Sequence, residues 1–102
     1  MADQSNHLYT VYVDDNFHYM DESERYVLGT FEDCETAIEE CKQIVDEFLL
    51  ANLTSGMTAR QLYGLYTSFG EDPWISGPES NCKFSAWTYA GQRSEELCLD
   101  KQ

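Results

Sequence analysis

The stretch Arg25–Leu50, RYVLGTFEDCETAIEECKQIVDEFLL, changes its hydrophobic period in its first third and decides the fold class. Its opening residues are rich in β-branched and aromatic types, which predicts a strand over 25–31. Further on, apolar residues recur at helical spacing with charged residues between them. This pattern predicts an amphipathic helix over about 34–51, with Asp33 as its N-cap.

Two segments extend the pattern in both directions. Residues 8–13, LYTVYV, predict a strand that pairs with 25–31 as an antiparallel hairpin. Thr58 and Gln61 spell a capping box that opens a second helix, and Gly70 is expected to end this helix.

Neither face of the predicted hairpin is cleanly polar. Because successive side chains of a strand point to opposite faces, Tyr12 and Val13 are expected on opposite faces of the first strand. In the second strand, Tyr26 and Leu28 are expected on the face opposite to Phe31. Apolar residues on both sides predict that both faces are covered or that one face is an interface. Tyr12 and Leu28 are therefore candidate partner-binding residues.

The C-terminal part gives weaker signals. Residues 71–81 contain both prolines and are expected to form a loop, with a short edge strand at most over 74–76. A second weak strand is expected over 82–86. A third helix is expected over about 85–97, with Ser85 as its cap and Trp87 facing inward.

This order does not alternate strands with helices, so we expect an α+β fold. A short antiparallel sheet would combine the N-terminal hairpin with one or two weak C-terminal strands, packed with about three helices. The 102 residues are expected to form a single domain over 1–102, with loose termini at 1–7 and about 99–102.

Nineteen acidic and six basic residues give a formal net charge of -13. Residues 1–51 carry -11 of this charge and residues 52–102 carry -2. Such a chain is not expected to bind nucleic acid directly or to bind an anionic membrane, because both surfaces would repel it. The first residues, MADQSNH, lack the pattern of a secretory signal, so a cytoplasmic location is expected.

Four cysteines, at 34, 41, 82 and 98, form no CxxC pair. Cys34 and Cys41 lie two helical turns apart, beyond the reach of a disulfide. All four are expected to be reduced, as is usual in the cytosol. With only two histidines in the chain, a zinc site is not expected, and no cofactor is predicted.

The acidic hairpin tip offers a candidate metal site. Asp14, Asp15 and His18 combine carboxylates with an imidazole, which suits a transition metal. The calcium-loop pattern of an EF-hand fails here because Tyr19 occupies its glycine position. The alternative interpretation is a solvated turn whose polar side chains bond to the local backbone.

The segment around Trp74 is a second candidate site. Glu71 and Asp72 precede a tryptophan that follows a proline, and tryptophan dominates many binding hot spots. We therefore consider Glu71, Asp72 and Trp74 as partner-binding residues. The alternative is that Trp74 covers the core as a lid.

Three segments resemble a family of small uncharacterised bacterial proteins of about one hundred residues. They are VYVDDNFHYMDESERY at 11–26, FGEDPWI at 69–75 and FSAWTYA at 84–90. The resemblance runs from Val11 to about Cys98. It implies a bacterial cytoplasmic protein of unassigned role and transfers no catalytic residue.

No catalytic constellation emerges, so the first hypothesis is a small acidic module for protein interaction or regulation. Its partner would be another protein or a second copy of the chain, as in a homodimer. One alternative is a nucleic-acid mimic that inhibits a DNA-binding protein, because a rigid acidic domain has the required charge. Another is a metal-dependent enzyme that uses the hairpin tip.

Overall fold

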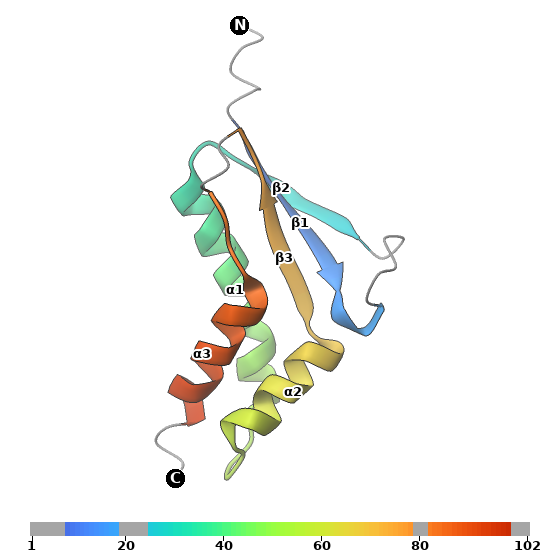
Figure 1. Cartoon of the computed structure of the whole chain (residues 1–102), viewed down its shortest axis with the longest axis vertical. Helices are drawn as coiled ribbons and strands as arrows, with labels where there is room; N and C mark the ends of the chain where they lie inside the picture. The colour runs from blue at the N-terminus through green and yellow to red at the C-terminus, as the bar shows by residue number, and fades with distance from the viewer. Residues whose placement is uncertain (1–7, 19–24, 79–81, 99–102) are drawn as a thin grey trace, which may run out of the picture.

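The computed structural model describes residues 8–18, 25–78 and 82–98. Over these residues the chain forms three strands, one 3-10 helix and three α-helices (Figure 1). In chain order they are β1 (Tyr9–Asp15), η2 (Asn16–His18), β2 (Tyr26–Phe31), α1 (Cys34–Asn52), α2 (Ala59–Phe69), β3 (Glu71–Ser76) and α3 (Ala86–Cys98). The predicted α+β fold is confirmed. The expected loose termini lie outside the described residues.

The sheet has the order β2-β1-β3, with both pairs antiparallel. The predicted hairpin of β1 and β2 is therefore confirmed, but β1 is the central strand. The short edge strand expected over 74–76 is confirmed, but it begins earlier, at Glu71, so the loop expected over 71–73 is wrong. Pro73 lies within β3, opposite Val13. An edge strand tolerates proline, since its outer side needs no ladder donor. The weak strand expected over 82–86 is wrong as well, because 82–85 are irregular and α3 follows.

All three predicted helix starts are confirmed by their caps. The Asp33 carboxylate accepts a hydrogen bond from the Thr36 backbone N–H at 2.7 Å. Thr58 and Gln61 form the reciprocal capping box that opens α2. The Ser85 hydroxyl accepts from the Thr88 backbone N–H at 3.3 Å, one residue before α3. Each cap satisfies backbone donors that the first helical turn leaves unpaired.

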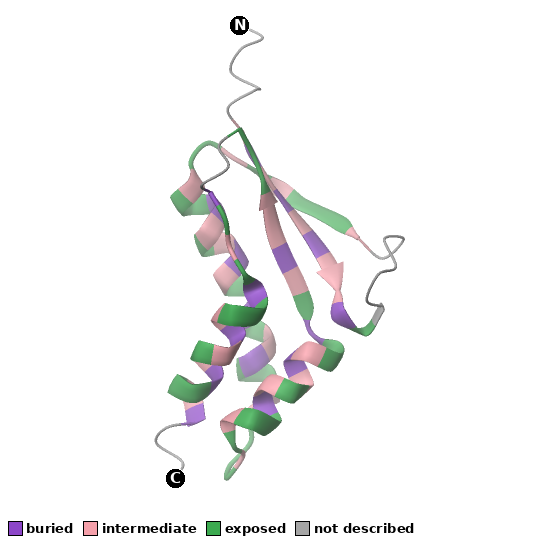
Figure 2. Cartoon of the chain, in the orientation of Figure 1, coloured by how far each residue is buried: buried purple, intermediate pink, exposed green. Residues whose placement is uncertain are grey.

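Over the described residues, the core consists of two clusters that α1 joins. Its buried residues Ala37, Cys41, Val45 and Leu49 recur every fourth position, so they form one stripe. The first half of this stripe packs on the sheet residues Tyr9, Val11 and Val13. The second half packs on α2 and α3. Figure 2 shows the buried residues along the inner sides of these elements. Of the described helices, none combines the length and apolar character needed to cross a membrane.

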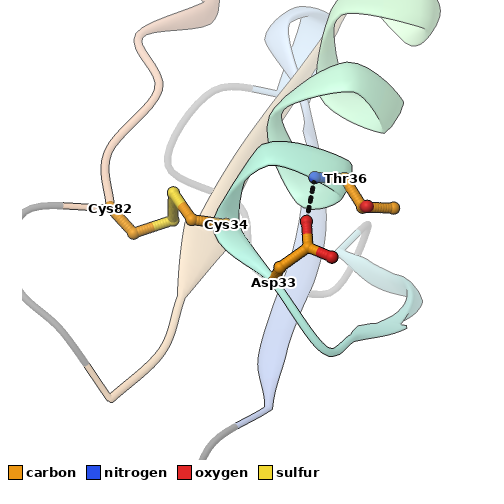
Figure 3. Close-up of a disulfide and its surroundings, with 4 residues drawn as sticks. All are labelled: Asp33, Cys34, Thr36 and Cys82. Atoms are coloured by element: carbon orange, nitrogen blue, oxygen red, sulfur yellow. Dashed lines mark hydrogen bonds between the residues drawn. A yellow bond between two sulfur atoms is a disulfide. The ribbon is translucent and has the colours of Figure 1, made fainter.

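Cys34 and Cys82 form a disulfide, with Cα atoms 5.8 Å apart (Figure 3). The expectation that all four cysteines are reduced is therefore wrong for these two. Cys34 lies too far from Cys41 to bond to it, but the segment before α3 returns to the first turn of α1 and brings Cys82 beside Cys34. Cys41 and Cys98 are free and buried. Burial raises the pKa of the Cys41 thiol to about 12, so it is inert packing.

Candidate interaction surface

Tyr12 and Trp74, both proposed as partner-binding residues, lie in register on β1 and β3. Their rings stack with centroids 4.7 Å apart and planes inclined by 22°. Pro73 and Ile75, which flank Trp74 in β3, point toward the core. Because successive side chains of a strand point to opposite faces, Trp74 lies on the other side of the sheet. The alternative of a lid over the core is therefore wrong. We call the side that carries Tyr12 and Trp74 the open face of the sheet.

A group of charged residues borders this aromatic pair. The Arg25 guanidinium binds the Asp14 carboxylate through two hydrogen bonds of 2.6 and 3.3 Å. It also lies over the Trp74 ring, with Cζ 5.1 Å from the centroid, as a cation–π contact. Asp72 lies opposite Asp14 across the strands. Burial, and then the nearby charge of Asp14, raise the pKa of Asp72 from its ordinary 3.8 to about 6.

Replacing Asp72 by Asn is expected to change how stability depends on pH. The raised pKa means that the folded state destabilises the Asp72 carboxylate at pH 7 and takes up a proton as the pH falls through about 6. The variant should therefore be more stable than the wild type at pH 7, by about 1 kcal/mol or less because Asp72 is only half-buried. The difference should vanish near pH 4. Urea unfolding at both values measures it, and a constant difference would contradict the assignment.

β2 presents the third predicted region. Tyr26, Val27 and Leu28 are 44%, 54% and 38% exposed, and Figure 2 shows β2 as a largely exposed strand. Val27 pairs with Tyr12 and Gly29 with Val11, so Leu28 is an extra residue that forms a β-bulge. Because of this bulge, Tyr26 and Phe31 lie on the same side of the sheet. The simple alternation expected from the sequence is wrong at this point.

Glu71 is tied to the first residue of β2. The Tyr26 hydroxyl donates a hydrogen bond to the Glu71 carboxylate at 3.1 Å. Burial and the Glu71 charge raise the pKa of Tyr26 to about 12, so this hydroxyl remains a donor at neutral pH. The five predicted partner-binding residues therefore lie on three neighbouring strands, but the stacked pair of Tyr12 and Trp74 is the one direct contact among them that the structure describes.

A second exposed surface was not predicted. Phe17 and Phe69 are 62% and 56% exposed, and their rings stack with centroids 5.5 Å apart. Trp87 is 37% exposed, and its indole N–H donates to the Asn16 side chain at 3.2 Å. The expectation that Trp87 faces inward is therefore wrong. We call Phe17, Phe69 and Trp87 the aromatic patch. Phe69 shares the helical spacing of the buried α2 residues Leu62 and Tyr66, so spacing alone does not predict its exposure.

Buried Asn16 connects the elements that carry the aromatic patch. Its side-chain amide donates to the Tyr66 carbonyl at 2.9 Å, and its amide oxygen accepts from Trp87. Its backbone N–H donates to the Gly70 carbonyl at 3.0 Å. One side chain thus links η2, α2 and α3, which fixes Phe17 beside Phe69.

Replacing Asn16 by Ala is expected to lower the free energy of unfolding by about 2 kcal/mol, because two half-buried or buried hydrogen bonds are lost. Denaturant unfolding measures the loss, and the NMR signal of the Trp87 indole N–H should shift. Asn52 is the matched control, since within the described part of the chain its amide donates to the local Phe48 carbonyl. Asn52→Ala should cost about 0.5 kcal/mol or less. Equal losses in both variants would contradict the linking role.

Asp14 and Asp15, two of the three proposed metal ligands, both have other partners in the structure. Asp14 is bound to Arg25, and the Asp15 carboxylate accepts from the Phe17 backbone N–H at 2.9 Å. The bond from Phe17 to Asp15 is a local contact between a side chain and the backbone, as the alternative interpretation of a solvated turn predicts. The side chain of His18 lies outside the described residues. Within the described part of the chain, no three His, Cys, Asp or Glu residues are grouped so that they would hold a metal ion.

Comparisons of this chain with protein-family models, with curated proteins and with solved structures return no match.

Proposed function

We propose that the protein is a small protein-interaction module that holds a partner protein against the aromatic patch. The observation that carries the proposal is the stacked pair of Phe17 and Phe69, each more than half exposed. Exposing two phenylalanine rings to water is unfavourable for an isolated domain. Clustered exposed apolar side chains mark binding surfaces, and large aromatic residues dominate their energetics.

The partner is proposed to be a protein because the alternatives fit the chemistry less well. A net charge of -13 repels nucleic acid and anionic membranes. The nucleic-acid mimic and the metal-dependent enzyme stay predictions from the sequence, and no contact described above favours either. A regulatory role and self-association are variants of the same proposal, distinguished by what occupies the patch.

Affinity capture from the native host with paired variants tests this function. The double variant Phe17→Ser, Phe69→Ser removes both phenylalanine rings of the aromatic patch. Because both side chains are more than half exposed, the fold should persist. Leu50→Ser is the control, because Leu50 is 54% exposed on α1. A partner should be retained by the wild type and by the control and lost from the double variant. Light scattering identifies a second copy as the partner if the mass doubles. Equal capture by all three proteins would contradict the proposal.

The compartment is a separate part of the proposal. The cytoplasmic location expected from the sequence requires Cys34 and Cys82 to be thiols in the cell, because the cytosol keeps thiols reduced. The disulfide between them is typical of an oxidising compartment. Alkylation of thiols in intact host cells distinguishes the cytoplasm from an oxidising compartment. Labelling of Cys34 and Cys82 would support the cytoplasm, and their protection would contradict it.

A further inference from the structure

β2 is an edge strand whose protection, within the described residues, is limited to the β-bulge at Leu28. In the described part of the chain, no strand lies on its outer side. Edge strands present unpaired backbone groups, and proteins commonly protect them with lysine, proline or a covering element. The sequence of β2, YVLGTF, contains neither a charge nor a proline. The opposite edge strand, β3, carries Pro73 and two acidic residues.

Acidic residues stand at both ends of this neutral strand. At the Phe31 end, Glu32 and Asp33 follow in the chain and are exposed. At the Tyr26 end, the charges of Glu71 on β3 and Glu47 on α1 both act on the Tyr26 hydroxyl. The adjacent cation, Arg25, is bound to the Asp14 carboxylate, so this end is negative as well. The edge therefore has an apolar centre, Val27 and Leu28, between two negative ends.

We propose that the outer edge of β2 accepts an extended segment of a partner protein as a fourth strand. The segment would carry Lys or Arg near its ends and apolar residues between them. Backbone hydrogen bonds would provide affinity, as in other cases of β-strand addition, while charge and side-chain alternation would provide selectivity. The inference assumes that the protein is an interaction module, but it uses a surface distinct from the aromatic patch.

A second copy of this chain fits the edge less well. If two copies paired through β2 in antiparallel fashion, Glu32 and Asp33 of one copy would face the Tyr26 end of the other. At that end Asp14 already neutralises Arg25, and the charges of Glu71 and Glu47 act on Tyr26. Parallel pairing would also bring like charges together at each end. With -13 on each chain, self-pairing is disfavoured and a basic segment is favoured.

The test uses a synthetic peptide, acetyl-KKVTVTVKK-amide, with the same peptide bearing Glu in place of Lys as its counterpart. The basic peptide should shift the backbone amide NMR signals of 26–31, and its affinity should fall as salt rises. The acidic peptide should not bind. Methylation of the peptide's backbone nitrogens on one side of its strand should abolish binding, because the ladder donors are lost.

Paired variants locate the binding. Val27→Lys should weaken the basic peptide about tenfold or more, since a like charge then faces it. Leu50→Lys is the matched control with the same charge change at the same 54% exposure, and it should retain most of the affinity.

Three results would overturn the inference. They are no shift in β2 at about 1 mM peptide, shifts confined to α1 or to the aromatic patch, and sedimentation showing a dimer that Val27→Lys dissociates. Shifts at Phe69 and Trp87 alone would reject the edge site and still support the aromatic patch.

Discussion

Replacing Cys34 and Cys82 together by Ala is expected to lower the free energy of unfolding by about 4 kcal/mol. The bond joins residues 48 positions apart, so it restricts a large loop in the unfolded chain. For a domain of this size, such a loss lowers the midpoint of thermal unfolding by roughly 15 to 30 °C. Urea and thermal unfolding of both proteins, followed by circular dichroism, measure the change.

The control for this prediction is chemical. Reduction of the wild type should lower its stability by a similar amount, whereas the double variant should not respond to the reductant. Cys41 and Cys98 are thiols in both proteins, so they cancel in the comparison. Equal stability of the oxidised and reduced wild type would show that the bond does not constrain the unfolded chain as expected.

The disulfide also holds the segment before α3 against the N-terminal end of α1, next to the sheet. Cys82 is buried and belongs to the cluster that packs between α1 and the sheet. The segment before α3 has no regular structure of its own, since 82–85 are irregular. The bond anchors this segment to the first turn of α1, while α3 itself packs in the other cluster.

The parts of the fold that follow from local sequence were predicted well. Asp33, Thr58 and Ser85 each act within four residues of their own position, so a single sequence is sufficient to identify them. The extent of β3 was not predictable in this way. Its residues include a proline and two acids, and they form a strand because β1 pairs with them across more than 50 residues of chain.

The candidate surfaces depend on the same long-range pairing. Tyr12 and Trp74 were proposed separately, and only the register of β1 with β3 makes them neighbours. The bulge at Leu28 changes which β2 side chains lie on each face of the sheet, and the alternation of residue types in the sequence does not reveal it. Phe17 and Phe69 come from different elements, one in a 3-10 turn and one at the end of α2, so no spacing pattern relates them.

Gly70 provides the second prediction, since its role is not the usual one of a glycine that ends a helix. Its φ is -79°, which every residue adopts easily. A Cβ at this position would lie 2.5 and 2.9 Å from two atoms of the buried Tyr66 ring and 2.9 Å from the Tyr66 carbonyl oxygen. Glycine is therefore needed for the close approach of the chain to Tyr66.

Gly70→Ala is expected to lower the free energy of unfolding by about 3 kcal/mol, because neither the buried ring nor the backbone has space to move. Displacing the ring would also weaken the hydrogen bond of 2.7 Å from the Tyr66 hydroxyl to the Glu71 carbonyl, at the start of β3. Gly64→Ala is the matched control. Gly64 lies in the exposed interior of α2, and a Cβ there meets nothing within 4 Å.

The control should raise stability by up to about 1 kcal/mol, since alanine favours a helix more than glycine does. The two substitutions add the same methyl group six positions apart, and they are expected to shift the urea midpoint in opposite directions. Destabilisation by both would mean that α2 does not tolerate a methyl group at either position, and a neutral Gly70→Ala would mean that the Tyr66 ring moves freely. Opposite shifts would establish that the packing of Tyr66 under Gly70 holds the junction between α2 and β3, on which the aromatic patch depends.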